Sequence, residues 1–188
     1  MAIIHSTTLT PGKLELLTVW LPHQPWYRGT GAPVLTKAGG FRLDDPDGEV
    51  GIEIMLAADA DGTTYVVPMT YRGAPLDGAD DALIGTSEHG VLGRRWIYDA
   101  ERDPVAVAQL LALARGEAEA QHQNVSDTVD RTVTRAWSGP ADAANLEVAR
   151  VLGAGDARDI RGGDSGDVAG WVAVASPVPN GRVLVVRR

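Results

Sequence analysis

The chain has 188 residues, 44% of them hydrophobic and 22% charged, a composition typical of a globular protein large enough to bury a core. The formal net charge of −8 argues against binding to nucleic acid or to an anionic membrane surface, because both need clustered positive charge. The absence of cysteine excludes disulfides and thiolate sites, and without a signal peptide or an apolar run of roughly 18 residues we expect a cytoplasmic protein.

One amphipathic helix is predicted near the start of the chain. Residues 2–9 have strand character, and Thr10-Pro11 supplies an N-cap followed by proline at the first helical position. An apolar stripe then follows helical spacing, and its members are Leu14, Leu17, Trp20 and Leu21. We therefore expect a helix over 11–21 whose apolar face enters the core.

The period then changes from that of a helix to that of strands. The strand-like segments are 33–44, 49–58 and 63–72, with the turn sequences DDPDG and DADG between them. Within the second segment, Ile52 and Ile54 share one face by alternation and are predicted to be core residues. This pattern predicts an antiparallel meander.

A loop, a strand and a second helix are expected next. Residues 75–93 are rich in glycine and aspartate, which predicts a loop, and 94–98 have strand character, with Trp96 predicted to lie in the core. Asp103-Pro104 has the order of an N-cap and first helical residue, and Gly116 stands where a helix ends. The pattern predicts a helix over 104–115.

The last third of the chain predicts short strands. Residues 117–127 are polar and expected to be exposed. Four strand-like runs follow, at Val129–Trp137, Leu146–Leu152, Val168–Ala175 and Arg182–Val186. Together with the two helices, these runs predict an α+β fold, an antiparallel sheet packed on a helix with a β-rich C-terminal extension.

No motif in the sequence identifies a nucleotide, cofactor or metal site. Gly153-Ala154-Gly155 begins like a dinucleotide fingerprint, but Arg158 stands at the third glycine position and no amphipathic helix follows. The four histidines show no metal-binding spacing. We expect no cofactor, no metal and no catalytic residues.

Three groups of residues are candidates for binding a ligand or partner. Asp80 and Asp81 belong to an acidic stretch whose carboxylates could hold a cation, but a solvated loop is the favoured interpretation. Trp26, Tyr27 and Arg28 offer either a stacking surface or the closing edge of a core.

The third group is Glu88 and His89 followed by Arg94 and Arg95. A carboxylate can orient an imidazole for acid–base work, and arginines bind anions. On a strand, however, Arg94 and Arg95 point to opposite faces, so at most one of them, taken here as Arg95, shares a site with His89. An ion-pair network between loop and sheet is the alternative.

Four stretches of this sequence resemble the N-terminal cap domain of the actinobacterial maltokinases. They are PGKLELL at 11–17, PWYRG at 25–29, DDPDGEVGIE at 44–53 and TYRGAPLDGADDALIGTSEHGVLGRRWIYD at 70–99. The resemblance covers roughly residues 1–115. It implies a cystatin-like unit, a curved antiparallel sheet wrapped on a helix, which in the kinases sits over an aminoglycoside-phosphotransferase-like body.

The kinase chemistry of that family has no counterpart in these residues. Phosphoryl transfer of this type needs a strand lysine, a His-x-Asp catalytic loop and metal-binding carboxylates. No histidine here has Asp two positions later, and both lysines, Lys13 and Lys37, lie in the cap. We therefore expect a stand-alone cap-like protein with a domain at 1–116, a polar connection with one strand-like run at 117–145 and a β-rich extension at 146–188. The extension either forms its own unit or belongs to the same domain.

Three hypotheses for function remain open at this point. The first is a non-catalytic interaction or regulatory module that acts with enzymes of α-glucan or trehalose–maltose metabolism, the pathway that the resemblance implies. The second is a small ligand-binding protein or enzyme that uses the Glu88/His89/Arg95 region, with a sugar among the conceivable ligands. The third is self-association through sheet edges.

Overall fold

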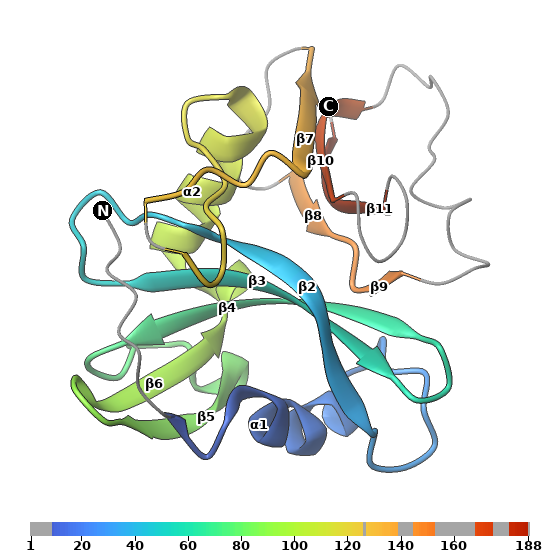
Figure 1. Ribbon diagram of the computed structural model, residues 1–188, viewed down its shortest axis with the longest axis vertical. Coiled ribbons are helices and arrows are strands. Elements are labelled where there is room, and N and C mark those ends of the chain that lie inside the picture. Colours follow the sequence, from blue (N-terminus) through green and yellow to red (C-terminus); the bar gives the residue numbers. More distant parts are fainter. Residues whose placement is uncertain (1–8, 126, 139–144, 153–167, 175–180, 188) are drawn as a thin grey trace.

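The computed structural model describes residues 9–125, 127–138, 145–152, 168–174 and 181–187. Its elements form three layers around a central antiparallel sheet, which we name sheet A (Figure 1). Helix α1 (Lys13–Trp20) lies on one face of sheet A. Helix α2 (Pro104–Arg115) and a second sheet, sheet B, lie on the other face. We call these faces the α1 face and the α2 face.

Sheet A has seven strands, and its main path runs in the order β1-β5-β6-β4-β3-β2. Its strands are β1 (Leu9–Thr10), β2 (Leu35–Leu43), β3 (Gly51–Asp59), β4 (Thr64–Arg72), β5 (Leu83–His89), β6 (Gly93–Asp99) and β9 (Val151–Leu152). Strands β6 and β9 share the same edge of β4, with Met69 of β4 opposite Asp99 and Tyr65 opposite Val151. A strand from the last third of the chain thus joins the N-terminal sheet.

The first helix occupies the predicted region but begins later than predicted. The N-cap is Gly12, and the backbone N–H of Gly12 donates to the Glu15 carboxylate at 2.6 Å. Thr10, the predicted cap, belongs instead to β1, which pairs with the end of β5. A 3-10 turn, η1 (Leu21–His23), continues α1, so the apolar stripe extends to Leu21 as expected. The predicted strand over 2–9 lies outside the described residues except for Leu9.

The predicted meander is confirmed by β2, β3 and β4, and the predicted strand over 94–98 is confirmed by β6. The predicted loop over 75–93 is wrong. That stretch holds a 3-10 turn, η2 (Asp80–Ala82), and the seven-residue strand β5. The alternation of β5 is broken at Gly85, where its pairing with β6 shifts register. A strand that contains such a bulge loses the clean period of two, which explains the wrong prediction.

Helix α2 confirms the predicted bounds. The Asp103 carboxylate accepts from the Val105 N–H at 3.0 Å, and Gly116 ends the helix in the left-handed conformation. A third 3-10 turn, η3 (Ala100–Arg102), leads into it. The following segment is less exposed than predicted, because Ala120 is buried and Gln121 exchanges two backbone hydrogen bonds with Arg42 of β2.

Sheet B forms from the predicted C-terminal runs, but the run predicted over 146–152 is divided, because residues 146–148 join sheet B while β9 joins sheet A. The order of sheet B is β7-β10-β11-β8, and all pairs are antiparallel. The strands are β7 (Val133–Trp137), β8 (Leu146–Val148), β10 (Val168–Val174) and β11 (Gly181–Arg187). The α+β class, a curved antiparallel sheet packed on a helix with a β-rich C-terminal extension, is confirmed.

Two hydrophobic clusters fill the spaces between the layers. On the α2 face, residues of sheet A meet α2 and sheet B; members include Phe41, Ile52, Ile54, Leu110, Val172 and Leu184. On the α1 face, members include Leu17, Trp20, Leu21, Met55, Tyr65 and Val67. Four predicted core residues, Leu17, Trp20, Ile52 and Ile54, are buried, whereas Leu14 and Trp96 are only half-buried. The division of the chain into domains at 116 and 146 stays a prediction.

Candidate functional site

The turn between β5 and β6 places two adjacent exposed apolar side chains at one end of sheet A. Val91 is 64% exposed and Leu92 is 45% exposed, and both lie in the three-residue turn after His89. Single exposed apolar residues are common on protein surfaces, but adjacent ones at the end of a hairpin form a compact contact point. We call Gly90, Val91 and Leu92 the hairpin tip.

Two of the residues selected from the sequence hold this tip in shape. The Nδ1 atom of His89 accepts hydrogen bonds from the backbone N–H groups of Val91 at 3.3 Å and Leu92 at 3.0 Å. From the other strand, Arg95 Nη2 donates to the carbonyl oxygen of Leu92 at 2.7 Å. The imidazole of β5 and the guanidinium of β6 thus each bind the turn backbone.

Glu88 does not join His89 and Arg95. Glu88 lies opposite Arg94 in the β5–β6 register and accepts from Arg94 Nε at 2.9 Å, while Arg95 lies opposite Ser87. Neighbouring residues of a strand point to opposite faces, so the Glu88–Arg94 ion pair and the His89–Arg95 pair lie on different sides of the hairpin. The geometry does not orient Glu88 toward the His89 ring.

Asp80 and Asp81 lie at the opposite end of β5, roughly 20 Å from the tip at about 3.3 Å per residue. Both are exposed, and Asp81 pairs with Arg102 at 3.3 Å, with both side chains more than half exposed. These carboxylates and the hairpin tip therefore do not form one site.

The aromatic group, Trp26 and Tyr27, packs against Tyr65 at the start of β4. Trp26 makes an edge contact with Trp20 at 5.7 Å between ring centroids, and Tyr27 lies 5.5 Å from the ring of the buried Tyr65. The Tyr65 hydroxyl accepts from the backbone N–H of Arg28 at 3.3 Å, and burial raises the pKa of Tyr65. Trp26 and Tyr27 are half-buried edges of the α1-face cluster, while the Arg28 residue is exposed.

Arg150, from the C-terminal part of the chain, packs its largely buried side chain against Trp26. Arg150 lies between β8 and β9, and its Nη2 atom donates to the Asp99 carboxylate, at 2.7 Å for the nearer oxygen, and to Glu101. Its guanidinium carbon stands 5.2 Å from the centre of the Trp26 ring. Only 11% of the Arg150 side chain is exposed. Trp26 therefore covers a structural ion pair that ties β9 to β6.

A second buried charge lies on the α1 face. The Glu53 side chain, 4% exposed, accepts from Lys13 Nζ at 2.5 Å and from the Tyr71 hydroxyl at 2.7 Å. Gln123 donates to its other oxygen at 2.9 Å. Burial raises the pKa of Tyr71, and the Glu53 charge raises it further. With three donors from separate segments, Glu53 fastens α1 and residues 121–124 to the sheet.

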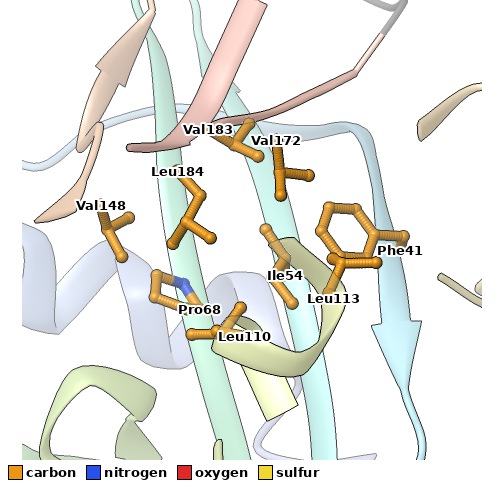
Figure 2. Close-up of a pocket in the computed structure, with 9 residues that line it drawn as sticks. All are labelled: Phe41, Ile54, Pro68, Leu110, Leu113, Val148, Val172, Val183 and Leu184. Atoms are coloured by element: carbon orange, nitrogen blue, oxygen red, sulfur yellow. The ribbon is translucent and has the colours of Figure 1, made fainter. Parts of the chain in front are cut away.

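Figure 2 shows an apolar cavity between the two sheets and α2. Its walls include Phe41, Ile54 and Pro68 of sheet A, Leu110 and Leu113 of α2, and Leu184 of sheet B. About 10 Å³ is open to the centre of a water molecule, whereas sites for small ligands measure hundreds of Å³. The cavity is a packing defect in the core.

Two further findings concern only the part of the chain that the structure describes. No group of three or more His, Asp or Glu side chains there is arranged to hold a metal ion. No helix there is long and apolar enough to cross a membrane.

Residues 20–103 match the family model of the maltokinase N-terminal cap domain, which confirms the resemblance predicted from the sequence over this stretch. The match begins in the last turn of α1 and ends at Asp103, the N-cap of α2. It includes the hairpin tip, Glu53 and the Asp99 carboxylate. Lys13, Gln123 and Arg150 lie outside the match.

Several residues that build these sites gave no functional signal in the sequence. Glu53 stands between Ile52 and Ile54, a pattern that normally indicates a solvent-facing position, and only a helix on the second face of the sheet buries it. Arg150 meets its carboxylates about fifty positions earlier in the chain. The hairpin tip was not predicted, because β5, the first strand of the hairpin, was predicted to be part of a loop.

Proposed function

We propose that this protein is a non-catalytic interaction module that docks on a protein partner through the hairpin tip of β5–β6. The support is the exposure of Val91 and Leu92 at a turn whose shape is fixed by His89 and Arg95. A preformed turn loses little conformational freedom on binding, so its apolar side chains contribute more of their burial to affinity.

The layers of the fold also favour docking through the tip over docking through a face of sheet A. The α1 face is covered by α1 and the aromatic group, and the α2 face is covered by α2 and sheet B. A partner therefore has access to edges, turns and outer surfaces. Among the described residues of sheet A, the tip has two adjacent exposed apolar side chains.

For the partner we propose an enzyme of α-glucan or trehalose–maltose metabolism, as the cap resemblance implies. In the maltokinases, the cap accompanies an aminoglycoside-phosphotransferase-like body. With a net charge of −8, this chain associates faster with a partner surface of positive charge, and salt slows that association.

A titration of the purified chain into a maltokinase body that lacks its own cap tests the proposal by calorimetry. We expect binding that weakens by at least about tenfold in the Val91→Asp/Leu92→Asp variant, because a central apolar contact is lost. Val125→Asp is the matched control, since Val125 is 50% exposed but lies outside the hairpin. No binding by the unaltered chain, or equal loss in the control, would contradict docking through the tip.

The alternative, a ligand site or enzyme at Glu88, His89 and Arg95, has weaker support. His89 Nδ1 and one Arg95 nitrogen are engaged by the turn backbone, and Glu88 faces away from them. We expect neither micromolar binding of Mg-ATP nor sugar-dependent ATP consumption. Either result, if abolished by His89→Ala in a chain that stays folded, would favour the enzyme over the docking module.

A further inference from the structure

Three aspartates of the chain stand directly before a glycine, and both residues of each pair are exposed. The pairs are Asp47-Gly48, Asp61-Gly62 and Asp77-Gly78. An Asp–Gly pair can close to a succinimide, because glycine has no side chain to hinder the attack of its backbone nitrogen on the preceding carboxyl group. Since the three pairs share their chemistry and their exposure, the place of each pair in the backbone decides how readily it reacts.

In two of the pairs the glycine closes a turn. The Gly48 N–H donates to the carbonyl oxygen of Asp45 at 3.0 Å, and the Gly62 N–H donates to the carbonyl oxygen of Asp59 at 3.0 Å. Each glycine is the last of four residues in its turn, so its nitrogen must give up the hydrogen bond that holds the turn before it can attack. The fold therefore protects both of these nitrogens.

Asp77 and Gly78 instead occupy the two central positions of their turn. The turn runs from Leu76 to Ala79, and the Ala79 N–H donates to the Leu76 carbonyl oxygen at 3.3 Å. Gly78 has a φ of +71° and Asp77 has no positive φ, which is the pattern of a type II turn. The peptide unit between the central residues of a turn can rotate while both flanking residues stay in place. Among the described residues, the Gly78 N–H has no acceptor and the Asp77 carboxylate has no partner.

We propose that Asp77 is a site of isoaspartate formation, with the Gly78 nitrogen as the nucleophile and water as the co-reactant. The nitrogen loses its proton and bonds to Cγ of Asp77, and one carboxyl oxygen leaves as water. Water then adds to the main-chain carbonyl carbon of the succinimide, and the bond from that carbon to the Gly78 nitrogen breaks. The backbone now runs through Cβ and Cγ of Asp77, and its α-carboxylate is free. One water is released and one is consumed, so atoms and charge balance.

The residues on either side of this turn are anchored, so the modification has a local structural effect. The Leu76 N–H donates to the hydroxyl of the buried Tyr98 at 2.9 Å, and Ala79 is only 3% exposed. Isoaspartate adds one backbone carbon between these two anchors. We therefore expect the hydrogen bond between Ala79 and Leu76 to open, and η2, which leads into β5, to loosen.

Incubation of the full chain in oxygen-18 water at neutral pH, followed by peptide mass spectrometry, tests the site. Hydrolysis of a succinimide adds one oxygen-18 atom, and electron-transfer fragments locate the label and identify isoaspartate. In the folded chain we expect Asp77 to be labelled at least about fivefold faster than Asp47 and Asp61, since their glycines must first give up a hydrogen bond. In concentrated urea the three rates should become similar. The proposal is overturned if Asp47 or Asp61 is labelled as fast as Asp77 in the folded chain, if Asp77 stays unlabelled there, or if urea leaves the ratios unchanged.

Two variants sharpen this test, and circular dichroism checks that both are folded. Asp77→Glu keeps the charge but would have to close a larger ring, so residues 73–94 should stay unlabelled. Asp61→Glu is the matched control and should leave the Asp77 rate unchanged. Labelling that persists within residues 73–94 of the Asp77→Glu chain would assign the reaction to Asp80 or Asp81 and overturn the proposal. If a variant does not fold, the ratios in the unaltered chain decide.

Hydrogen exchange after prolonged incubation tests the structural effect. The Ala79 amide should exchange faster in the incubated unaltered chain than in the incubated Asp77→Glu chain, because only the former gains a backbone carbon in the turn. Equal exchange at Ala79, in a sample whose Asp77 is largely isoaspartate, would contradict the effect assigned to the modification.

Discussion

The two faces of sheet A are covered in different ways. The α2 face is an extended apolar layer in which α2 and sheet B meet Phe41, Ile52 and Ile54. The α1 face combines an apolar cluster with a buried carboxylate, Glu53, and with the Arg150 ion pairs at its border. Apolar contacts are non-directional and so constrain the orientation of the packed elements only weakly. A buried charge is costly unless specific partner groups contact it, so it selects one arrangement of the segments around it.

This difference indicates a division of roles between the faces. Much of the α2-face cover comes from residues after 103, beyond the stretch that matches the cap family. The α1 face holds the polar contacts that position α1, the aromatic group and residues 121–124. Substitutions in the apolar layer of the α2 face should therefore act mainly through lost burial. Those at Glu53 on the α1 face, and at the Arg72–Asp103 pair where α2 begins, should act through lost polar contacts.

The largest effect is expected for Phe41→Ala on the α2 face. Phe41 is 1% exposed and lines the cavity between the sheets, so truncation enlarges an existing void. We expect a loss of about 3–5 kcal/mol in the free energy of unfolding, measured by urea denaturation. Val34→Ala is the exposed control on the same stretch of chain, with an expected change within about 0.5 kcal/mol. Equal effects would show that Phe41 is not in the core.

The next largest effect is expected for Arg72→Met, which breaks the bidentate pair with Asp103 at the start of α2. The Nε and Nη2 atoms of Arg72 each lie 2.7 Å from the fully buried Asp103 carboxylate. Removing one partner of a buried ion pair lowers the free energy of unfolding by about 3–5 kcal/mol. Because Arg72 is partly exposed, we expect a loss of about 3 kcal/mol for this variant.

The Arg72→Met effect should fade in acid. Burial alone would raise the pKa of Asp103, but the hydrogen bonds and charge of Arg72 outweigh it and hold that pKa below its usual value. A lowered folded-state pKa contributes stability above the unfolded pKa near 4, and this stability is lost as the pH falls through the folded pKa. Melting temperatures of the two proteins should converge as the pH falls through the folded-state pKa of Asp103. A constant difference would exclude this linkage.

A smaller effect is expected for Glu53→Gln on the α1 face. The amide keeps an acceptor for Tyr71 but no longer neutralises Lys13 and cannot accept at both positions. We expect a loss of about 1–3 kcal/mol in unfolding free energy, together with faster hydrogen exchange in α1 and in residues 121–124. Faster exchange spread evenly over the sheet would argue against a role in fastening these segments.

The smallest effect is expected for Arg94→Ala at the hairpin. The Glu88–Arg94 pair has side chains 58% and 62% exposed, and exposed pairs contribute about 0.2–1 kcal/mol. The melting temperature should change little, and high salt should erase the difference. A large loss would indicate that this pair holds the tip, a role we assign to His89 and Arg95.

The sequence predicted elements well where local signals agree and poorly where tertiary contacts decide. Asp103-Pro104 and Gly116 mark both ends of α2, and the turn sequences mark the meander. The register shift at Gly85 hid β5, since a bulge breaks the alternation on which strand prediction depends. The site was less predictable, because the neighbours of His89 and Glu53 follow from strand register and from segments far along the chain.

Hydrogen exchange of the full chain, alone and with a maltokinase body that lacks its own cap, tests the proposed docking most directly. We predict slower exchange in the amides of residues 83–99, strongest at the turn around Val91 and Leu92, with α1 and the described strands of sheet B unchanged. Slower exchange centred on α1 or on sheet B, or no change at any amide under saturating partner, would contradict docking through the hairpin tip.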